Sequence, residues 1–138
     1  YQSYLQKFFE ALKAGDESRF AEFYFKDEDF KLDNAQGDGA SPEESINAQR
    51  LKFVDDCRKL SKQLEKYKAV NIQSYFASSS SKVERVRLRE VMPGARRFKS
   101  SVSMEILADG ELGNLTIEGL VLLEDGWRLG KIATIDLP

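Results

Sequence analysis

The amino-acid sequence predicts an α+β domain in which N-terminal helices pack on one face of an antiparallel sheet. Up to about Tyr67, apolar side chains recur every three or four residues, which is the spacing of amphipathic helices. From Val70 onward they alternate with polar side chains, and the Asp-Gly pairs at residues 109–110 and 125–126 are typical of hairpin turns. Helices followed by hairpin-linked strands indicate an α+β architecture, and a chain of 138 residues is expected to form one domain, residues 1–138.

The first segment is expected to be a helical hairpin. One face of its first helix is apolar, and the side chains on that face are Tyr1, Tyr4, Leu5, Phe8, Phe9 and Leu12. Gly15 suits the left-handed residue that ends a helix. Asp16 can cap the next helix by accepting from its free N–H groups. That second helix is expected to be short, to end near Phe25 and to have an aromatic inner side.

The next part of the chain is expected to contain a short strand, a loop and a long helix. Phe30 and Leu32 alternate with polar neighbours, which favours a strand before the glycine-containing loop at residues 37–39. The stretch "SPEE" at residues 41–44 has a serine N-cap, a proline in the first turn and a glutamate that closes a capping box. We expect the helix to run to about Tyr67. Its apolar stripe consists of Ile46, Phe53, Cys57, Leu60, Leu64 and Tyr67.

The remainder is expected to be a meander of strands. The alternating apolar side chains of its first strand are Val70, Ile72 and Phe76. The run "SSSS" at residues 78–81 predicts a flexible turn, and a second strand is expected where arginines alternate with Val86 and Leu88. Longer strands follow around residues 98–106, 115–123 and 127–137. Gly130 interrupts the last of them and is interpreted as a bulge.

The composition excludes several kinds of site. The chain has no histidine and a single cysteine, so it lacks the residues for a Ser-His-Asp or Cys-His centre, for histidine metal ligation or for a structural zinc site. The acidic stretch from Asp16 to Glu44 lacks the ligand spacing of a calcium loop and is interpreted as solvated loop and helix caps. With a net charge of −2 and no apolar run near the roughly 20 residues of a membrane helix, we expect no metal, cofactor, nucleic-acid partner or membrane span.

Two stretches carry a resemblance to a known fold family. These are "YLQKFFEALKAGDESRFAEFYFKDEDFKLDN" near the start and "EDGWRLGKIATIDLP" at the end, with the middle of the chain matching by element order. The chain resembles the nuclear-transport-factor-two-like superfamily of cystatin-like fold, which includes ketosteroid isomerases, polyketide cyclases, scytalone dehydratases and many small exported bacterial domains. The resemblance implies a strongly curved antiparallel sheet that wraps the helices into a cone with a pocket at its open end.

The resemblance also indicates where catalytic groups would lie. In ketosteroid isomerases a catalytic tyrosine lies eight residues before the Asp of the Gly-Asp pair, and here that position is Phe8, which cannot donate a hydrogen bond to a developing enolate. The isomerase base corresponds in place to Asp33, our candidate catalytic residue. A second acid would come from a later strand, where Glu105 and Glu118 are available. Cyclases and dehydratases of the family also rely on histidine, which this chain lacks.

Two groups of residues are candidates for binding. The expected lining of a ligand pocket is Phe8, Phe9, Leu12, Tyr24, Phe53 and Trp127, although ordinary core packing explains aromatic residues equally well. Arg85, Arg87 and Arg89 are expected to project from one strand face, where they would bind an anion or an acidic partner. The alternative is an outward sheet face whose charges discourage edge pairing.

Three functions remain open from the sequence. The first is a non-catalytic module that binds a small apolar molecule or a protein. The second is an enzyme that moves a proton next to a carbonyl, with Asp33 as base. The third is a structural domain that forms a homodimer through its sheet. The chain begins at Tyr1 rather than Met, which is compatible with a removed targeting segment and with an exported or cell-envelope protein of a bacterium.

Overall fold

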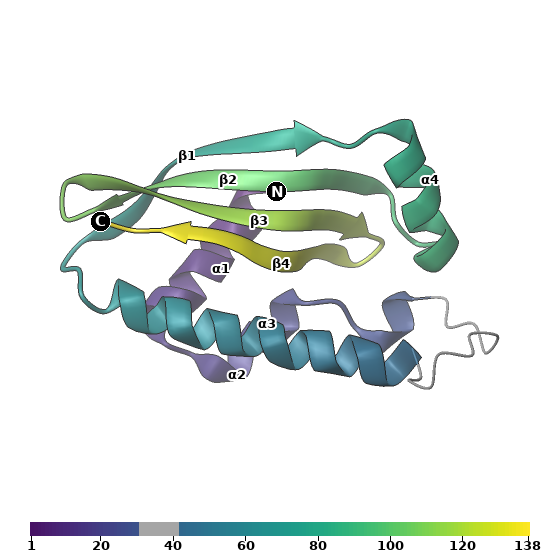
Figure 1. Ribbon diagram of the computed structural model, residues 1–138, viewed down its shortest axis with the longest axis horizontal. Helices are drawn as coiled ribbons and strands as arrows, with labels where there is room; N and C mark the ends of the chain where they lie inside the picture. Colours follow the sequence, from purple (N-terminus) through teal and green to yellow (C-terminus); the bar gives the residue numbers. More distant parts are fainter. Residues whose placement is uncertain (31–41) are drawn as a thin grey trace.

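The computed structural model describes residues 1–30 and 42–138, with helices first and one antiparallel sheet afterwards. In chain order the elements are α1 (Gln2–Ala14), α2 (Glu17–Phe20), η1 (Ala21–Phe23), η2 (Asp27–Asp29), α3 (Pro42–Leu64), β1 (Val70–Ser79), α4 (Lys82–Val91), β2 (Arg97–Ala108), β3 (Glu111–Leu123) and β4 (Gly126–Asp136). In Figure 1, α1 crosses behind the sheet, α3 runs along β4 and α4 stands at one end of the sheet. This arrangement confirms the predicted α+β class.

The four strands pair in the order β1-β2-β3-β4, and every pair is antiparallel. Both predicted hairpins form, although the second turns at residues 124–125, one residue before the position of the predicted Asp-Gly turn. Asp109 and Gly110 both have positive φ, 48° and 87°, as a tight two-residue hairpin turn requires. The Asp109 carboxylate also accepts hydrogen bonds from the backbone N–H groups of Lys68 and Ala69, at 2.9 and 2.8 Å. The β2–β3 turn is thereby fixed to the segment that leads from α3 into β1.

The helical hairpin at the start of the chain is confirmed, with one difference at its hinge. Gly15 is left-handed, with φ 66°, and its N–H reaches the carbonyl oxygens at the end of α1. The predicted cap by Asp16 is wrong, because its carboxylate accepts a 2.6 Å hydrogen bond from the Ser18 hydroxyl and none from a backbone N–H of α2. Helix α2 ends at Phe20 and the 3₁₀ turn η1 continues to Phe23, so the short second helix ends before the predicted position near Phe25.

Residues 82–91 form helix α4, so the predicted strand with three arginines on one face is wrong. The Ser81 hydroxyl accepts from the backbone N–H of Glu84 at 3.1 Å, and the Glu84 carboxylate accepts from the backbone N–H of Ser81 at 3.1 Å. This capping box begins a helix immediately after β1. In a helix, Arg85 and Arg89 share one side, whereas Arg87 points about 160–200° away from them.

A β-bulge reverses the alternation of side chains in β1. Ile72 pairs with Ile106 and Ser74 pairs with Glu105, so one extra residue lies between the two β1 positions. A shift of one residue moves all later side chains to the opposite face. Phe76 is therefore not on the inner face with Val70, as the sequence predicted, but on the outer face with 72% of its surface exposed.

Three smaller predictions also need correction. Residues 27–29 form a 3₁₀ turn instead of the start of a strand, while Leu32 lies outside the described residues. Helix α3 ends at Leu64, three residues before Tyr67. The register shift between β3 and β4 falls between Thr116 and Ile117 and not at Gly130, whose α-carbon instead lies against the backbone of β3.

The core fills the space between the helices and the inner face of the sheet. Its fully buried large side chains include Leu5, Phe8, Phe9, Leu12, Phe20, Leu60, Met104, Ile106, Leu115, Ile117 and Leu120. Helix α1 contributes most of its apolar face to this core, as predicted. Within the described residues, no helix is both long and apolar enough to cross a bilayer.

Candidate functional site

The α1 residues expected to line a pocket lie inside the packed core. Phe8, Phe9 and Leu12 have no exposed surface. The Phe8 ring packs edge-on against Phe23, with centroids 5.2 Å apart, and is stacked with Phe53 at 6.0 Å. The Phe8 ring, at the position where the resemblance would place a catalytic tyrosine, thus fills the interior.

Tyr24 and Phe53, also expected to line a pocket, meet at a cleft between α3 and β4. This α3–β4 cleft has a volume of about 170 Å³, and its lining consists of Tyr24, Gln49, Lys52, Phe53, Asp56, Lys131 and Ile132. The rings of Tyr24 and Phe53 are 5.0 Å apart and form its floor together with Ile132. Both rings are largely buried, and the polar residues of the cleft lie on its rim.

The polar residues of the α3–β4 cleft are two lysines, one glutamine, one tyrosine and one aspartate, Asp56. The Tyr24 hydroxyl donates to Gln49 Oε1 at 3.3 Å. Burial raises the pKa of this hydroxyl, with nearby Arg50 opposing the shift, so the group keeps its proton at neutral pH. Lys52 and Lys131 are exposed on the rim, and neither forms an ion pair with another described residue. The cleft therefore combines an aromatic floor with two ammonium groups.

Sequence reasoning missed the polar half of this cleft. Lys52 lies one residue from Phe53 and Lys131 one residue before Ile132, yet the two lysines belong to elements far apart in the chain. In the sequence, the helix residue Lys52 and the strand residue Lys131 each look like an ordinary exposed charged side chain. Only the packing of α3 along β4, visible in Figure 1, brings them to the same cleft.

Trp127 lies away from the α3–β4 cleft, next to a buried ion-pair network that the sequence did not reveal. Its ring packs edge-on against Tyr1, with centroids 6.3 Å apart. The next residue, Arg128, is buried; its Nε donates to Asp29 Oδ2 at 3.0 Å, and one terminal nitrogen donates to both oxygens of Asp125 at 2.9 and 3.0 Å. Arg128 thus ties the η2 turn to the β3–β4 hairpin.

A second, more acidic cleft of about 610 Å³ lies beside this network. Its lining includes Glu28, Asp29, Glu124 and Asp125. Two of these four acids, Asp29 and Asp125, already pair with Arg128, and Lys26 adds a contact to Asp125 at 3.6 Å. Hydrogen bonds from Arg128 hold the pKa of Asp125 below its ordinary value. Among the described residues, no group of three or more Cys, Asp or Glu side chains is placed to hold a metal ion.

The candidate catalytic acids are not brought together by the described structure. Asp33 lies outside the described residues. Glu105 and Glu118 are exposed on the strands β2 and β3. The Tyr4 hydroxyl, which feels the charges of Arg128 and Asp125, donates to the carbonyl oxygen of Phe23 at 3.1 Å. Burial raises the pKa of Tyr4, which fits a structural hydrogen-bond donor.

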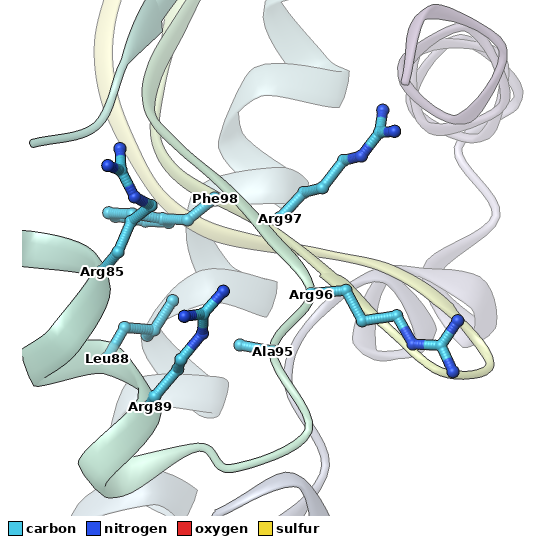
Figure 2. A pocket seen from close by; sticks show the side chains of 7 residues that line it. All are labelled: Arg85, Leu88, Arg89, Ala95, Arg96, Arg97 and Phe98. Atoms are coloured by element: carbon cyan, nitrogen blue, oxygen red, sulfur yellow. The ribbon is translucent and has the colours of Figure 1, made fainter. Parts of the chain in front are cut away.

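The three arginines of the predicted anion patch lie on α4. Arg85 and Arg89 line a small surface depression between α4 and the start of β2, shown in Figure 2. Arg87 is not part of its lining. The helix therefore separates Arg87 from Arg85 and Arg89, whereas the predicted strand would have placed all three on one face.

Comparisons with known proteins address the fold. No family model matches the chain, and no curated protein matches it. The chain is similar to a crystal structure, at 2.00 Å resolution, of a "Putative NTF2-like transpeptidase" from Campylobacter jejuni. The TM-score is 0.48 at 13% sequence identity, and the match covers 93% of this chain and 94% of that chain. The helices followed by one antiparallel sheet agree with the element order that the resemblance to the nuclear-transport-factor-two-like superfamily implied.

Proposed function

We propose that this chain is a non-catalytic module that binds a small molecule in the α3–β4 cleft. The ligand would have a flat apolar body and one acidic group. The proposal rests on one observation: the aromatic side chains of Tyr24 and Phe53 and the two rim lysines, Lys52 and Lys131, line the same cleft. A few polar groups around an apolar floor are typical of small-molecule sites.

The dimensions of the cleft favour a ligand of modest size and affinity. A volume of about 170 Å³ is below the usual range for drug-sized ligands. A ligand of about ten non-hydrogen atoms, at about 0.3–0.4 kcal/mol per atom, would bind with roughly 3–4 kcal/mol. That free energy corresponds to a Kd in the millimolar range. A natural ligand that also donated a hydrogen bond to Asp56 would bind more tightly.

The packed interior supports a binding role over an enzymatic one. Phe8 fills the position from which a tyrosine would stabilise an enolate, and its neighbours Phe9 and Leu12 are fully buried. In the α3–β4 cleft the single carboxylate is Asp56, whose neighbours on the lining include two lysines. Proton transfer with Asp33 as base stays a prediction from the sequence.

Phenylacetate should bind the α3–β4 cleft, because its ring matches the aromatic floor and its carboxylate can reach the rim lysines. We expect a millimolar Kd in an NMR titration, and a loss of affinity of about fivefold or more in Lys52→Gln/Lys131→Gln, since each lost charge contact is worth a substantial part of 1 kcal/mol at an exposed site. Phenylacetamide, which has the same shape without the charge, should bind the unmodified protein more weakly.

The matched control is Lys7→Gln/Lys62→Gln, which removes the same charge from exposed positions outside the cleft. This variant should bind phenylacetate within about twofold of the unmodified protein, because only long-range, salt-screened effects change. Equal affinities of the two lysine variants, or equal binding of the acid and the amide, would show that the rim lysines do not select the ligand.

A second candidate function is self-association through the outer face of the sheet. Phe76 and Leu112 are 72% and 60% exposed there, and they border a shallow groove of about 380 Å³ that also includes Ser103 and Glu105. Large exposed apolar side chains on one face often mark a contact surface. A sheet face can meet a copy of itself about a two-fold axis, which makes a second copy of the chain the natural partner.

Phe76→Ser should shift a monomer–dimer equilibrium toward the monomer if the outer face forms the interface. The measurement is sedimentation equilibrium over a range of protein concentrations, with Val83→Ser on α4 as a control of similar exposure. An interface that persists in solution would bury more than about 1,000 Å². A protein that is monomeric at all accessible concentrations, or a dimer insensitive to Phe76→Ser, would exclude this candidate.

A further inference from the structure

The positive charge of this acidic protein is concentrated at one corner. The chain has a net charge of −2, yet residues 82–99 contain seven basic and only two acidic side chains. In the fold, α4 and the start of β2 are adjacent, so these residues gather at one end of the sheet (Figure 1). We refer to Arg85, Arg89, Arg96 and Arg97 together as the arginine corner.

The arginine corner surrounds a shallow depression. Arg85 and Arg89 lie one helical turn apart on the same side of α4, where Cβ atoms are separated by about 6 Å. Arg96 and Arg97 lie on the strand side, and Leu88, Ala95 and Phe98 form the apolar base between the two pairs. Figure 2 shows the side chains of Arg96 and Arg97 extending away from this base, while Arg85 and Arg89 rise beside it.

Most of the charge at the arginine corner is not neutralised by described residues. One terminal nitrogen of Arg85 donates to the carbonyl oxygen of Ser80 at 2.6 Å, which fixes the side chain without cancelling its charge. Arg96 approaches Glu124 only at 3.8 Å, with both side chains mostly exposed. Arg89 and Arg97 have no ion pair with a described residue.

This situation differs from that of other arginines in the protein. Arg50, Arg58 and Arg128 each pair with a carboxylate at 2.8–3.0 Å. Arg85 and Arg89, one helical turn apart beside the depression, repel each other, and the repulsion is relieved when an anion binds between them. The arginine corner is therefore electrostatically complementary to an anion. The described residues of the chain do not provide that anion.

The geometry points to a phosphate group as the anion, and we propose that the arginine corner binds one. A carboxylate has two oxygens and is satisfied by one guanidinium, whereas a phosphate has enough oxygens and charge to accept from several. The depression has a volume of only about 10 Å³, too small to enclose a phosphate, so the group would rest over it between the arginine side chains while the remainder of the ligand stays in solvent. This site is separate from the α3–β4 cleft and shares no residue with it.

Two sources of such a group are consistent with the surface. One is a free phosphate compound. The other is the headgroup of an anionic lipid, because Val83, Val86 and Val91 on α4 are 48–59% exposed next to the basic side chains. Both sources would be recognised by the same guanidinium groups.

The test is binding of inorganic pyrophosphate, and separately of phosphatidylcholine vesicles with and without phosphatidylglycerol, to the full chain. Amide shifts followed during the pyrophosphate titration should be largest in residues 82–97. Arg85→Gln/Arg89→Gln should weaken binding of the preferred probe about tenfold or more, because charge-assisted hydrogen bonds are lost. Raising the salt concentration should weaken it further.

Two other variants make the result interpretable. Arg89→Gln/Arg97→Gln removes arginines that make no hydrogen bond or ion pair with a described residue, so its effect on binding is separable from any effect on folding. Lys7→Gln/Lys62→Gln has the same change of charge at exposed positions away from the corner and should bind within about twofold of the unmodified protein.

The arms of the experiment assign the source. Binding of pyrophosphate without vesicles identifies a free phosphate compound, and binding of the anionic vesicles alone identifies a lipid headgroup. The proposal is overturned if neither probe perturbs residues 82–97 beyond the effect of chloride at equal ionic strength. It is equally overturned if both arginine variants bind as well as Lys7→Gln/Lys62→Gln.

Discussion

Replacement of Arg128 by methionine should destabilise the protein by about 3–5 kcal/mol, because it leaves a buried carboxylate without its partner. The side chains of Arg128 and Asp29 are only 6% and 8% exposed, and their ion pair measures 3.0 Å. Methionine retains much of the apolar stem and removes the charge. Urea unfolding followed by circular dichroism measures the change in the free energy of unfolding.

Two controls distinguish the effect of losing the ion pair between Arg128 and Asp29 from the effect of replacing an arginine by methionine. Arg87→Met replaces an exposed arginine on α4 and should change stability by no more than about 0.5 kcal/mol. Arg128→Met/Asp29→Asn also removes the orphaned carboxylate and should recover part of the loss, because a buried neutral amide costs less than a buried charge. If Arg128→Met is as stable as Arg87→Met, the buried network does not hold η2 against the hairpin.

The same substitution should change the titration of Asp125. Hydrogen bonds from Arg128 lower the pKa of this carboxyl, so the stabilising contact is present above its ordinary pKa and is lost as pH falls through the lowered value. In Arg128→Met the pKa of Asp125 should return toward its ordinary value. Carboxyl chemical shifts followed from neutral to acidic pH measure the difference.

Gly130→Ala should destabilise the protein by about 3 kcal/mol or more, because the added methyl group has no space. A Cβ atom at this position would lie 2.2 Å from the carbonyl oxygen of Glu118 and 2.9 Å from that of Gly119. Both contacts are with backbone, so β3 and β4 would have to separate. The variant should show a lower urea midpoint, or accumulate as insoluble protein on expression.

The matched control for Gly130→Ala is Gly94→Ala. A Cβ atom at Gly94 meets only the end of the Leu123 side chain at 3.8 Å, which is an ordinary van der Waals contact. Its effect should stay within about 1 kcal/mol, with a reduced entropy of the unfolded chain as the main contribution. Similar stabilities of the two alanine variants would contradict the close approach of β3 and β4 at this point.

The parts of the fold that the sequence predicted correctly depend on local signals. Gly15 ends α1, and Asp109 and Gly110 form a hairpin turn, because backbone conformation at these positions is set by one or two residues. Helix α4 was missed because its arginines alternate with apolar residues over a short stretch. Ser81 and Glu84 carry the capping-box signal that would have corrected the prediction.

Features that depend on contacts between residues far apart in the chain were harder to predict from the sequence. The outward turn of Phe76 follows from a bulge whose position is set by pairing with β2. Asp29 and Arg128 are 99 residues apart, and nothing local shows that they pair. For the candidate cleft, Tyr24 and Phe53 were proposed from the sequence, whereas Lys52 and Lys131 became visible only when α3 was placed along β4.

We propose that small ligands bind in the α3–β4 cleft and not inside the packed core. Methyl NMR during a phenylacetate titration tests it directly, because Ile132 lies in the cleft and Leu12 is fully buried in the core. We predict saturable shifts of the Ile132 methyl signals with the Leu12 signals unchanged. Shifts of Leu12 with Ile132 unaffected, or no saturable shift of either residue, would contradict the claim.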